Sequence, residues 1–115
     1  MNQETTPAKP MPRDDDVLIK AIRRVQAALG LTHEQLLSIL KTSILDELDA
    51  ASEKGKRAAT LISIYQRLCA YVGDSKKTLR HWVSTHNRYL RASPVDVMST
   101  DSGLDQVIGY LNSRR

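Results

Sequence analysis

The chain of 115 residues has a single cysteine and no long apolar run. One cysteine cannot form an internal disulfide, so a reducing compartment fits the chain better than secretion. No apolar run approaches the about 18 residues that a membrane span needs. The first residues, MNQETTPAKPMPRDDD, also lack the apolar centre of a signal peptide. We therefore expect a cytoplasmic protein that does not contact a membrane.

What is present predicts a modest core and a basic surface. The apolar share of 41% can support one compact unit of this length. A net charge of +4 permits an acidic partner, either nucleic acid or protein. Residues 1–13 are rich in Pro, Thr and charge and have little to bury, so we expect a disordered arm there.

Helical patterns begin directly after this arm. Residues 14–30 combine an acidic start, an apolar stripe and a closing Gly30. Thr32 with Gln35 forms a capping-box pattern, and Ser43 with Asp46 repeats it, which predicts two further short helices. The second of these would reach Ala51.

The remaining residues continue the helical pattern. Between Gly55 and Gly73 the apolar residues follow the spacing of one long helix. Asp74 or Ser75 can cap the next helix. Ser93, Pro94 and Asp96 predict another start with a capping box, and a last helix carries a stripe from Leu104 to Leu111. No strand pattern or repeat is found, so we predict an all-α fold, a compact bundle of about six to seven helices.

Candidate catalytic and metal-binding groups have structural interpretations. The three histidines, His33, His81 and His86, include no i, i+4 pair that could start a zinc site. The acidic residues 14–16 are more typical of a solvated helix cap than of a metal cluster. Cys69 lies on an apolar stripe with no histidine at helical spacing, which favours an inert core thiol over a nucleophile. We therefore predict a protein that is not an enzyme and holds no cofactor or metal.

Residues 14–55 resemble a helix-turn-helix of the Xre type. Residues 29–31, LGL, match the segment that leads into its second helix, and the positions after them match that helix. These positions are Thr32, Gln35, Leu36 and Leu40. The expected recognition helix, however, reads ILDELDA after residues 41–43 and would turn Asp46, Glu47 and Asp49 toward phosphates. We interpret this region as a degenerate helix-turn-helix that serves mainly as scaffold or dimer surface.

The charge distribution agrees with this interpretation. Residues 1–53 contain 6 Lys and Arg and 9 Asp and Glu, a net −3, whereas residues 54–115 contain 11 and 4, a net +7. Phosphate neutralisation supplies nearly all non-specific DNA affinity, so an acidic recognition helix is a handicap. The cations that could partly offset it, and so contact promoter DNA weakly, are Lys20, Arg23, Arg24 and Lys41.

Residues 81–100, HWVSTHNRYLRASPVDVMST, carry the most distinctive pattern and hold the only Trp. Read singly, Trp82 and Leu90 are core residues, Asn87 ends a helix, and Ser93-Pro94 starts one. Together with the last helix, the stretch resembles the C-terminal toxin-binding domain of the Xre/MbcA/ParS antitoxins. The positions that carry the resemblance are Trp82, Asn87, Leu90, Pro94, Asp96, Val97, Met98, Thr100, Gly103, Val107, Ile108, Tyr110 and Leu111. One departure is Arg91-Ala92, where the family usually has glycine.

The resemblance implies an antitoxin without chemistry of its own. It would neutralise a RES-type toxin, whose pocket handles NAD, by covering that pocket, and it would form a homodimer or a higher oligomer. Residues 56–115 would be the toxin-binding domain. The expected toxin-binding residues are Asn87, Arg88, Arg91, Pro94, Asp96, Thr100, Asn112, Arg114 and Arg115. The expected core residues of this domain are Trp82, Leu90, Leu104, Val107 and Leu111. We expect Trp82 to be buried between helices, because it lies beside apolar Leu79 and Val83.

Two other functions stay open at this point. The chain could be a DNA-binding repressor without a toxin partner, or an orphan helical module that binds some other protein. A toxin gene in the neighbouring reading frame would favour the antitoxin, and its absence would favour the other two.

Overall fold

The computed structural model describes residues 14–114, and the predicted arm, residues 1–13, lies outside them together with Arg115. The elements follow the order α1 (Asp14–Leu29), α2 (His33–Leu40), the 3-10 turn η1 (Leu45–Glu47), α3 (Glu53–Val72), α4 (Lys76–Ser84), α5 (Pro94–Met98) and α6 (Gly103–Asn112). Within these residues the only bridge of the strand type is an isolated pair, Asn87 with Ala92. The predicted all-α bundle is confirmed.

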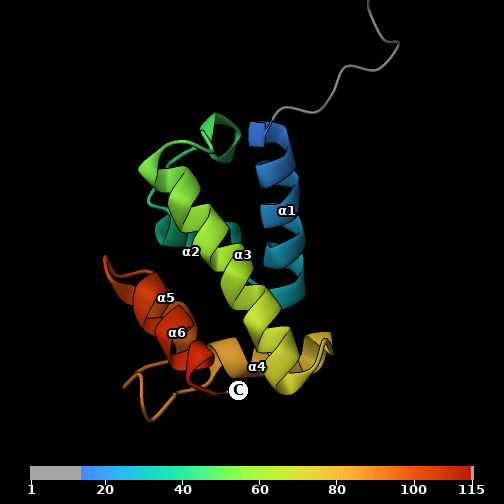
Figure 1. Ribbon diagram of the computed structural model, residues 1–115, viewed down its shortest axis with the longest axis vertical. Helices are drawn as coiled ribbons and strands as arrows, with labels where there is room; N and C mark the ends of the chain where they lie inside the picture. The colour runs from blue at the N-terminus through green and yellow to red at the C-terminus, as the bar shows by residue number, and fades with distance from the viewer. Residues whose placement is uncertain (1–13, 115) are drawn as a thin grey trace, which may run out of the picture.

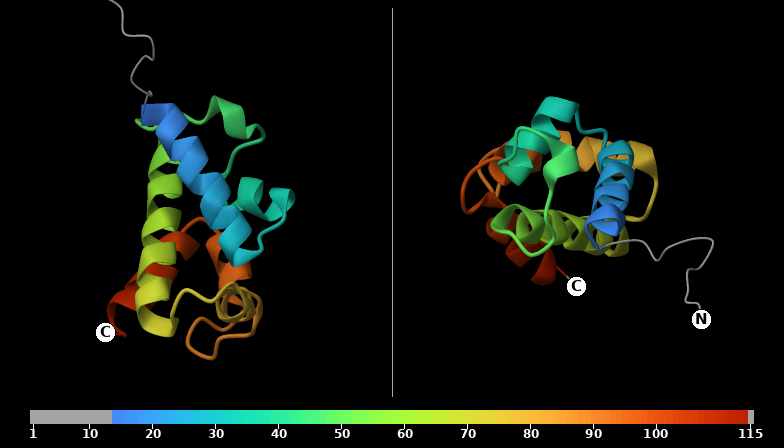
Figure 2. Two further views of the ribbon diagram at one scale, coloured as in Figure 1. Left: turned by 90° about the vertical axis from the view of Figure 1, so that its right-hand side faces the viewer. Right: turned by 90° about the horizontal axis from the view of Figure 1, so that it is seen from above.

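Helix α3 is the axis on which the other helices pack. Figure 1 shows it running through the middle of the molecule, with α1 along one side, α6 along the other and α4 across its C-terminal end. Seen from above in Figure 2, α1, α2 and α3 surround a common interior. Helix α3 contributes Ala58, Leu61, Ile64 and Leu68 to this interior. The buried residues of α1 to α6 form one continuous hydrophobic cluster.

Two helix starts follow the predicted caps, and a third has a cap that was not predicted. The capping box at α2 is confirmed, because the Gln35 amide donates to Thr32 Oγ1 at 3.0 Å and the Thr32 amide donates to Gln35 Oε1 at 2.9 Å. Ser52 caps α3 by accepting from the Gly55 amide. Of the two residues predicted to cap α4, Ser75 does so by accepting from the Thr78 amide. None of the helices among residues 14–114 is both long and apolar enough to span a membrane.

The prediction of a second short helix that starts at Ser43 and reaches Ala51 is wrong. Only the 3-10 turn η1 forms, and its N-cap residue, Ile44, makes no side-chain cap. Leu45 and Leu48 are both buried, and an i, i+3 pair shares one face in a 3-10 turn as well as in an α-helix. The backbone beyond the turn is satisfied elsewhere, since the Ala50 amide donates to the Asp15 carboxylate at 2.9 Å.

The capping box predicted for α5 is also wrong. Ser93 is the N-cap residue and Pro94 follows it, but the Ser93 side chain makes no capping hydrogen bond. The backbone carbonyl of Ser93 instead accepts from the amides of Asp96 and Val97. Pro94 still has its expected place in the first turn, where its missing N–H costs nothing.

Gly103 permits a close approach between α5 and the start of α6. A Cβ atom at Gly103 would overlap the Val97 carbonyl oxygen, so no larger residue fits without a backbone shift. Gly109, further along the same helix, is exposed and has no atom near the place that a Cβ would take. A close backbone contact therefore requires glycine at position 103, whereas no such contact requires it at position 109.

We expect Gly103→Ala to lower the free energy of unfolding by about 1–3 kcal/mol, because the added methyl group overpacks the α5–α6 contact. Gly109→Ala, the matched control, should raise it by about 0.5–1 kcal/mol by removing backbone entropy from the unfolded chain. Urea unfolding of both variants measures the difference. Equal effects of the two substitutions would contradict the close approach at Gly103.

Candidate functional site

The loop between α4 and α5 is closed by Asn87. Its backbone pairs with both ends of a short turn, since the Asn87 amide donates to the Ala92 carbonyl at 2.9 Å and the Arg91 amide donates to the Asn87 carbonyl at 2.8 Å. Its side chain accepts from the amides of Tyr89 and Leu90 at 2.9 and 3.1 Å. The alternative that Asn87 ends a helix is wrong, because α4 ends at Ser84. Asn87 instead fixes the shape of the loop.

Three aromatic rings gather beside this loop. The ring centroids of Trp82 and Tyr110 are 6.3 Å apart, and those of Tyr89 and Tyr110 are 5.7 Å apart. The Arg114 guanidinium lies over two of the rings, with Cζ 4.6 Å from the Tyr89 centroid and 4.9 Å from the Tyr110 centroid. Such distances are those of cation–π contacts. We call Trp82, Tyr89, Tyr110 and Arg114 the aromatic cluster.

The prediction that Trp82 is buried is wrong. The side chain is only partly buried and packs against the edge of the core, whereas its neighbours Leu79 and Val83 on α4 are buried within it. Helix α4 lies at the end of the bundle, so the other helices cover its apolar side only in part. Leu90 is also partly buried, while Leu104, Val107 and Leu111 of α6 are buried.

A pocket of about 290 Å³ opens between the loop and the aromatic cluster. Its walls are His81, Trp82, Thr85, His86, Asn87, Arg88, Tyr89 and Tyr110. None of these lining residues is acidic, whereas Arg88 is cationic and two histidines stand beside it. Contact with the Tyr89 side chain also raises the pKa of Arg114, so its guanidinium is charged at any physiological pH. The surface can therefore hold an anionic group beside aromatic rings.

The structure brings some predicted binding residues together and separates others. Asn87 and Arg88 line the pocket, Arg91 is exposed in the same loop, and Arg114 stacks on the rings next to it. Asn112 and Asp96 are exposed on α6 and α5. Arg115 lies outside the described residues.

Two of the predicted binding residues have internal contacts instead. Pro94 is buried in the core, so its ring does not form part of the surface. The Thr100 hydroxyl donates to the Val97 carbonyl at 2.7 Å, which ties it to the end of α5. Pro94 therefore shapes the segment that joins α5 to α6, residues 99–102, from within the core, whereas Thr100 belongs to this segment and remains exposed.

Of the four cations predicted to contact DNA, two have partners within the chain and two are exposed along α1. Arg23 pairs with Asp46 at 3.2 Å, with both side chains largely exposed. Lys41 Nζ donates to the Ser99 carbonyl at 2.6 Å and lies 3.6 Å from the Asp101 carboxylate. Lys20 and Arg24 are exposed along α1. Two of the four cations are therefore engaged within the chain.

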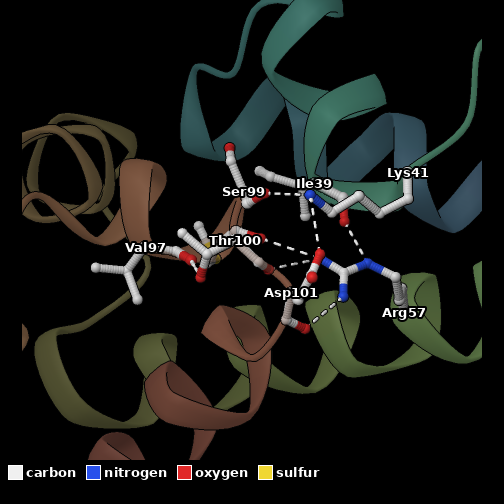
Figure 3. A network of polar contacts seen from close by, with 8 residues as sticks. Ile39, Lys41, Arg57, Val97, Ser99, Thr100 and Asp101 are labelled. Carbon is white, nitrogen blue, oxygen red and sulfur yellow. Dashed lines mark hydrogen bonds and ion pairs between the residues drawn. The ribbon is translucent and has the colours of Figure 1, made fainter.

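Arg57 has a structural role that the sequence pattern did not reveal. Its guanidinium donates to the Ile39 carbonyl at 2.6 Å and to the carbonyls of Met98, Thr100 and Asp101 at 3.1 to 3.2 Å. Figure 3 shows these bonds converging from α2 and from the α5–α6 segment on one side chain of α3. A single Arg near the start of a long helix has no sequence signature for such contacts.

The other candidate reactive groups show no assembled site. Cys69 is partly buried against the core, and its contact with Tyr65 raises the pKa of that phenol. Within residues 14–114, no three side chains of His, Cys, Asp or Glu lie close enough together to hold a metal ion. The pocket at the aromatic cluster is thus the site that combines charge, aromatic surface and access.

Comparison with known proteins points to the same part of the chain. Residues 67–115 match the family described as the antitoxin Xre/MbcA/ParS C-terminal toxin-binding domain. The matched range contains the loop, the pocket and the whole aromatic cluster. Among curated proteins the chain finds no match.

The partial burial of Trp82 leads to a test on α4. We expect Trp82→Ala to lower the free energy of unfolding by only about 1–3 kcal/mol, because folding removes only part of the indole surface from water. Leu79→Ala, on the same helix but fully buried, should cost about 2–5 kcal/mol. Chemical unfolding of the two variants compares them, and a larger loss for Trp82→Ala would show that the indole is a core residue after all.

Proposed function

We propose that the protein neutralises a RES-type, NAD-consuming toxin in the cytoplasm, because residues 67–115 match the Xre/MbcA/ParS antitoxin C-terminal toxin-binding domain. It would do so by binding the toxin and covering its active site. The proposal needs no chemistry from the antitoxin itself. Neutralisation then depends on the affinity and the placement of one protein surface.

The observation that carries the proposal is the acid-free pocket beside the aromatic cluster, inside the family range. Aromatic residues and Arg are enriched among the residues that dominate binding energy at protein interfaces. Arg88 and Arg91 in the loop and Arg114 at the end of α6 place positive charge around the rings. We propose that these cations pair with carboxylates at the rim of the toxin's cleft, while the rings cover its opening.

The predicted surface would be centred on the loop and the chain end. Asn87 holds the loop in shape, and Asp96 and Asn112 lie on α5 and α6. We keep these residues, with Arg115, in the proposed interface. Pro94 would support it from within the core, and the exposed Thr100, whose hydroxyl donates to the Val97 carbonyl, would lie at its edge.

Reversing the charge of the loop tests the proposal. We expect Arg88→Glu with Arg91→Glu to weaken toxin binding by about 2–5 kcal/mol if the pairs are buried, because partner carboxylates lose their cations and meet like charge. The measurement is growth rescue of cells that express the cognate toxin, together with the dissociation constant of the purified pair.

The matched control reverses two exposed lysines at the other end of α4, Lys76→Glu with Lys77→Glu. It changes the net charge by the same amount, and carboxylates are favourable at a helix start. We expect this control to rescue growth like the parent. Full rescue by the folded Arg88 and Arg91 variant would place the interface elsewhere. Failure of the parent to bind any neighbouring toxin would favour an orphan interaction module.

DNA binding is the second function, and we propose that it is weak. Asp46 is already paired with Arg23, Lys41 is tied to the α5–α6 segment, and the turn η1 stands in place of a recognition helix. Two of the four candidate cations are therefore paired within the chain, which lowers the positive charge that this region offers to phosphates. A homodimer or a higher oligomer, which the sequence resemblance implies, would be needed to gather more cations on one DNA site.

We therefore expect the free protein to bind its own promoter with a dissociation constant of about 1 µM or weaker at physiological salt, the range of non-specific binding. Fluorescence titration with promoter DNA and with a scrambled duplex measures both values. A tight complex that distinguishes the two duplexes would support the repressor instead.

A further inference from the structure

Arg114 is held by aromatic rings from two separate segments. Tyr110 lies on α6, which ends two residues before Arg114, and Tyr89 comes from the α4–α5 loop. The guanidinium carbon lies under 5 Å from both ring centroids, at 4.6 and 4.9 Å. Arg114 therefore joins the chain end to the loop that lines the pocket.

The Arg114 Nε atom is buried and has no hydrogen-bond partner among the described residues. A buried donor without an acceptor is unfavourable, so other contacts must hold the side chain there. Stacking of a guanidinium on two phenol rings provides such contacts. The rings, rather than an ion pair, are the main fixed partners of this cation.

Tyr89 has no core role that would explain its position. It is 66% exposed, the most exposed of the large apolar side chains that project from the described surface. The Asn87 side chain accepts from its backbone amide and so fixes the residue within the loop. A large exposed ring on a backbone that is fixed in this way is typical of a binding surface.

We propose that Tyr89 and Tyr110 are positioning residues for toxin binding, which hold the Arg114 guanidinium beside the pocket so that it can meet an acidic segment of the toxin. This inference rests on the proposed function. An acidic segment is the partner that fits, because Arg88 lines the pocket and no acidic residue does.

Preorganisation explains how two tyrosines would affect affinity through a third residue. A long arginine side chain has many rotamers, and ordering it during association reduces affinity. If the rings already hold the guanidinium, that ordering has taken place before the toxin arrives. Removing a ring should then weaken binding even if the ring itself touches little of the toxin.

The stacking is tested first in the free protein. Aromatic rings shift the NMR signals of protons above their faces, so the Arg114 side-chain protons should resonate upfield of the usual arginine positions. Tyr89→Leu should move these signals back toward the usual positions, while Tyr89→Phe should keep them, because it retains the ring. Signals at ordinary positions in the parent would overturn the proposal without any toxin being present.

The effect on binding is tested by a double-mutant cycle with the purified toxin. We expect Tyr89→Leu and Arg114→Ala each to raise the dissociation constant about tenfold, and the double variant to lose little more than either alone, because both changes remove the same positioned cation. Tyr89→Phe should bind like the parent. Circular dichroism of each variant checks that the helices are intact, which the exposure of Tyr89 leads us to expect.

The outcomes separate the two proposals. Parent binding with fully additive losses, or with no loss for Tyr89→Leu, would overturn the positioning role and leave the toxin-binding function in place. No binding by the parent would overturn the proposed function and with it this inference, whether or not the NMR signals show the stacking.

Discussion

The guanidinium of Arg57 satisfies backbone carbonyls that the ends of two helices leave without partners. Ile39 belongs to the last turn of α2, and Met98 is the last residue of α5. Carbonyls at helix ends have no intrahelical donor and carry the negative end of the helix dipole. A single fork of N–H groups from α3 meets both sets, and hydrogen bonds from a charged donor are worth about 1.5–3 kcal/mol each in favourable cases.

The position of α6, and with it the site, depends on this constraint. Arg57 also binds the carbonyls of Thr100 and Asp101, and Lys41 binds that of Ser99, so the whole α5–α6 segment is fixed from α2 and α3. Gly103 then starts α6 directly against Val97. The direction in which α6 leaves this contact determines where Tyr110 and Arg114 meet the loop.

Local signals in the sequence were sufficient for most of the helices. The capping box at Thr32 and the long stripe of α3 specify their helices through contacts within a few residues. The turn η1 could not be predicted in this way. Leu45 and Leu48 have a spacing that fits both helix types, and the bond from Ala50 to Asp15 spans 35 positions. Long-range contacts of this kind decide between two local structures that the sequence allows equally.

The candidate site was predictable in composition but not in arrangement. The basic residues of the loop could be read from the sequence, whereas the stacking of Arg114 on Tyr89 depends on the course of the loop. That course requires a left-handed backbone at Arg91, with φ of 65°. Glycine adopts this conformation most easily, so an arginine there gives no sign in the sequence of the turn that it makes. The burial of Trp82 was predicted wrongly for a related reason. The apolar residues of α4 indicate which side of the helix faces inward, but not how much of that side the other helices cover.

The form of the site suits a protein partner better than a small ligand. Its pocket of about 290 Å³ is at the small end of the range for small-molecule sites, and Tyr89 at its wall is 66% exposed. A small ligand there would keep much of its surface in water. A protein surface can instead cover the pocket, the rings and the surrounding arginines at once, and exclude water from all of them. The energy of such a contact would come from a few fixed aromatic and guanidinium groups, and these are the groups that Asn87 and the α5–α6 segment hold in place.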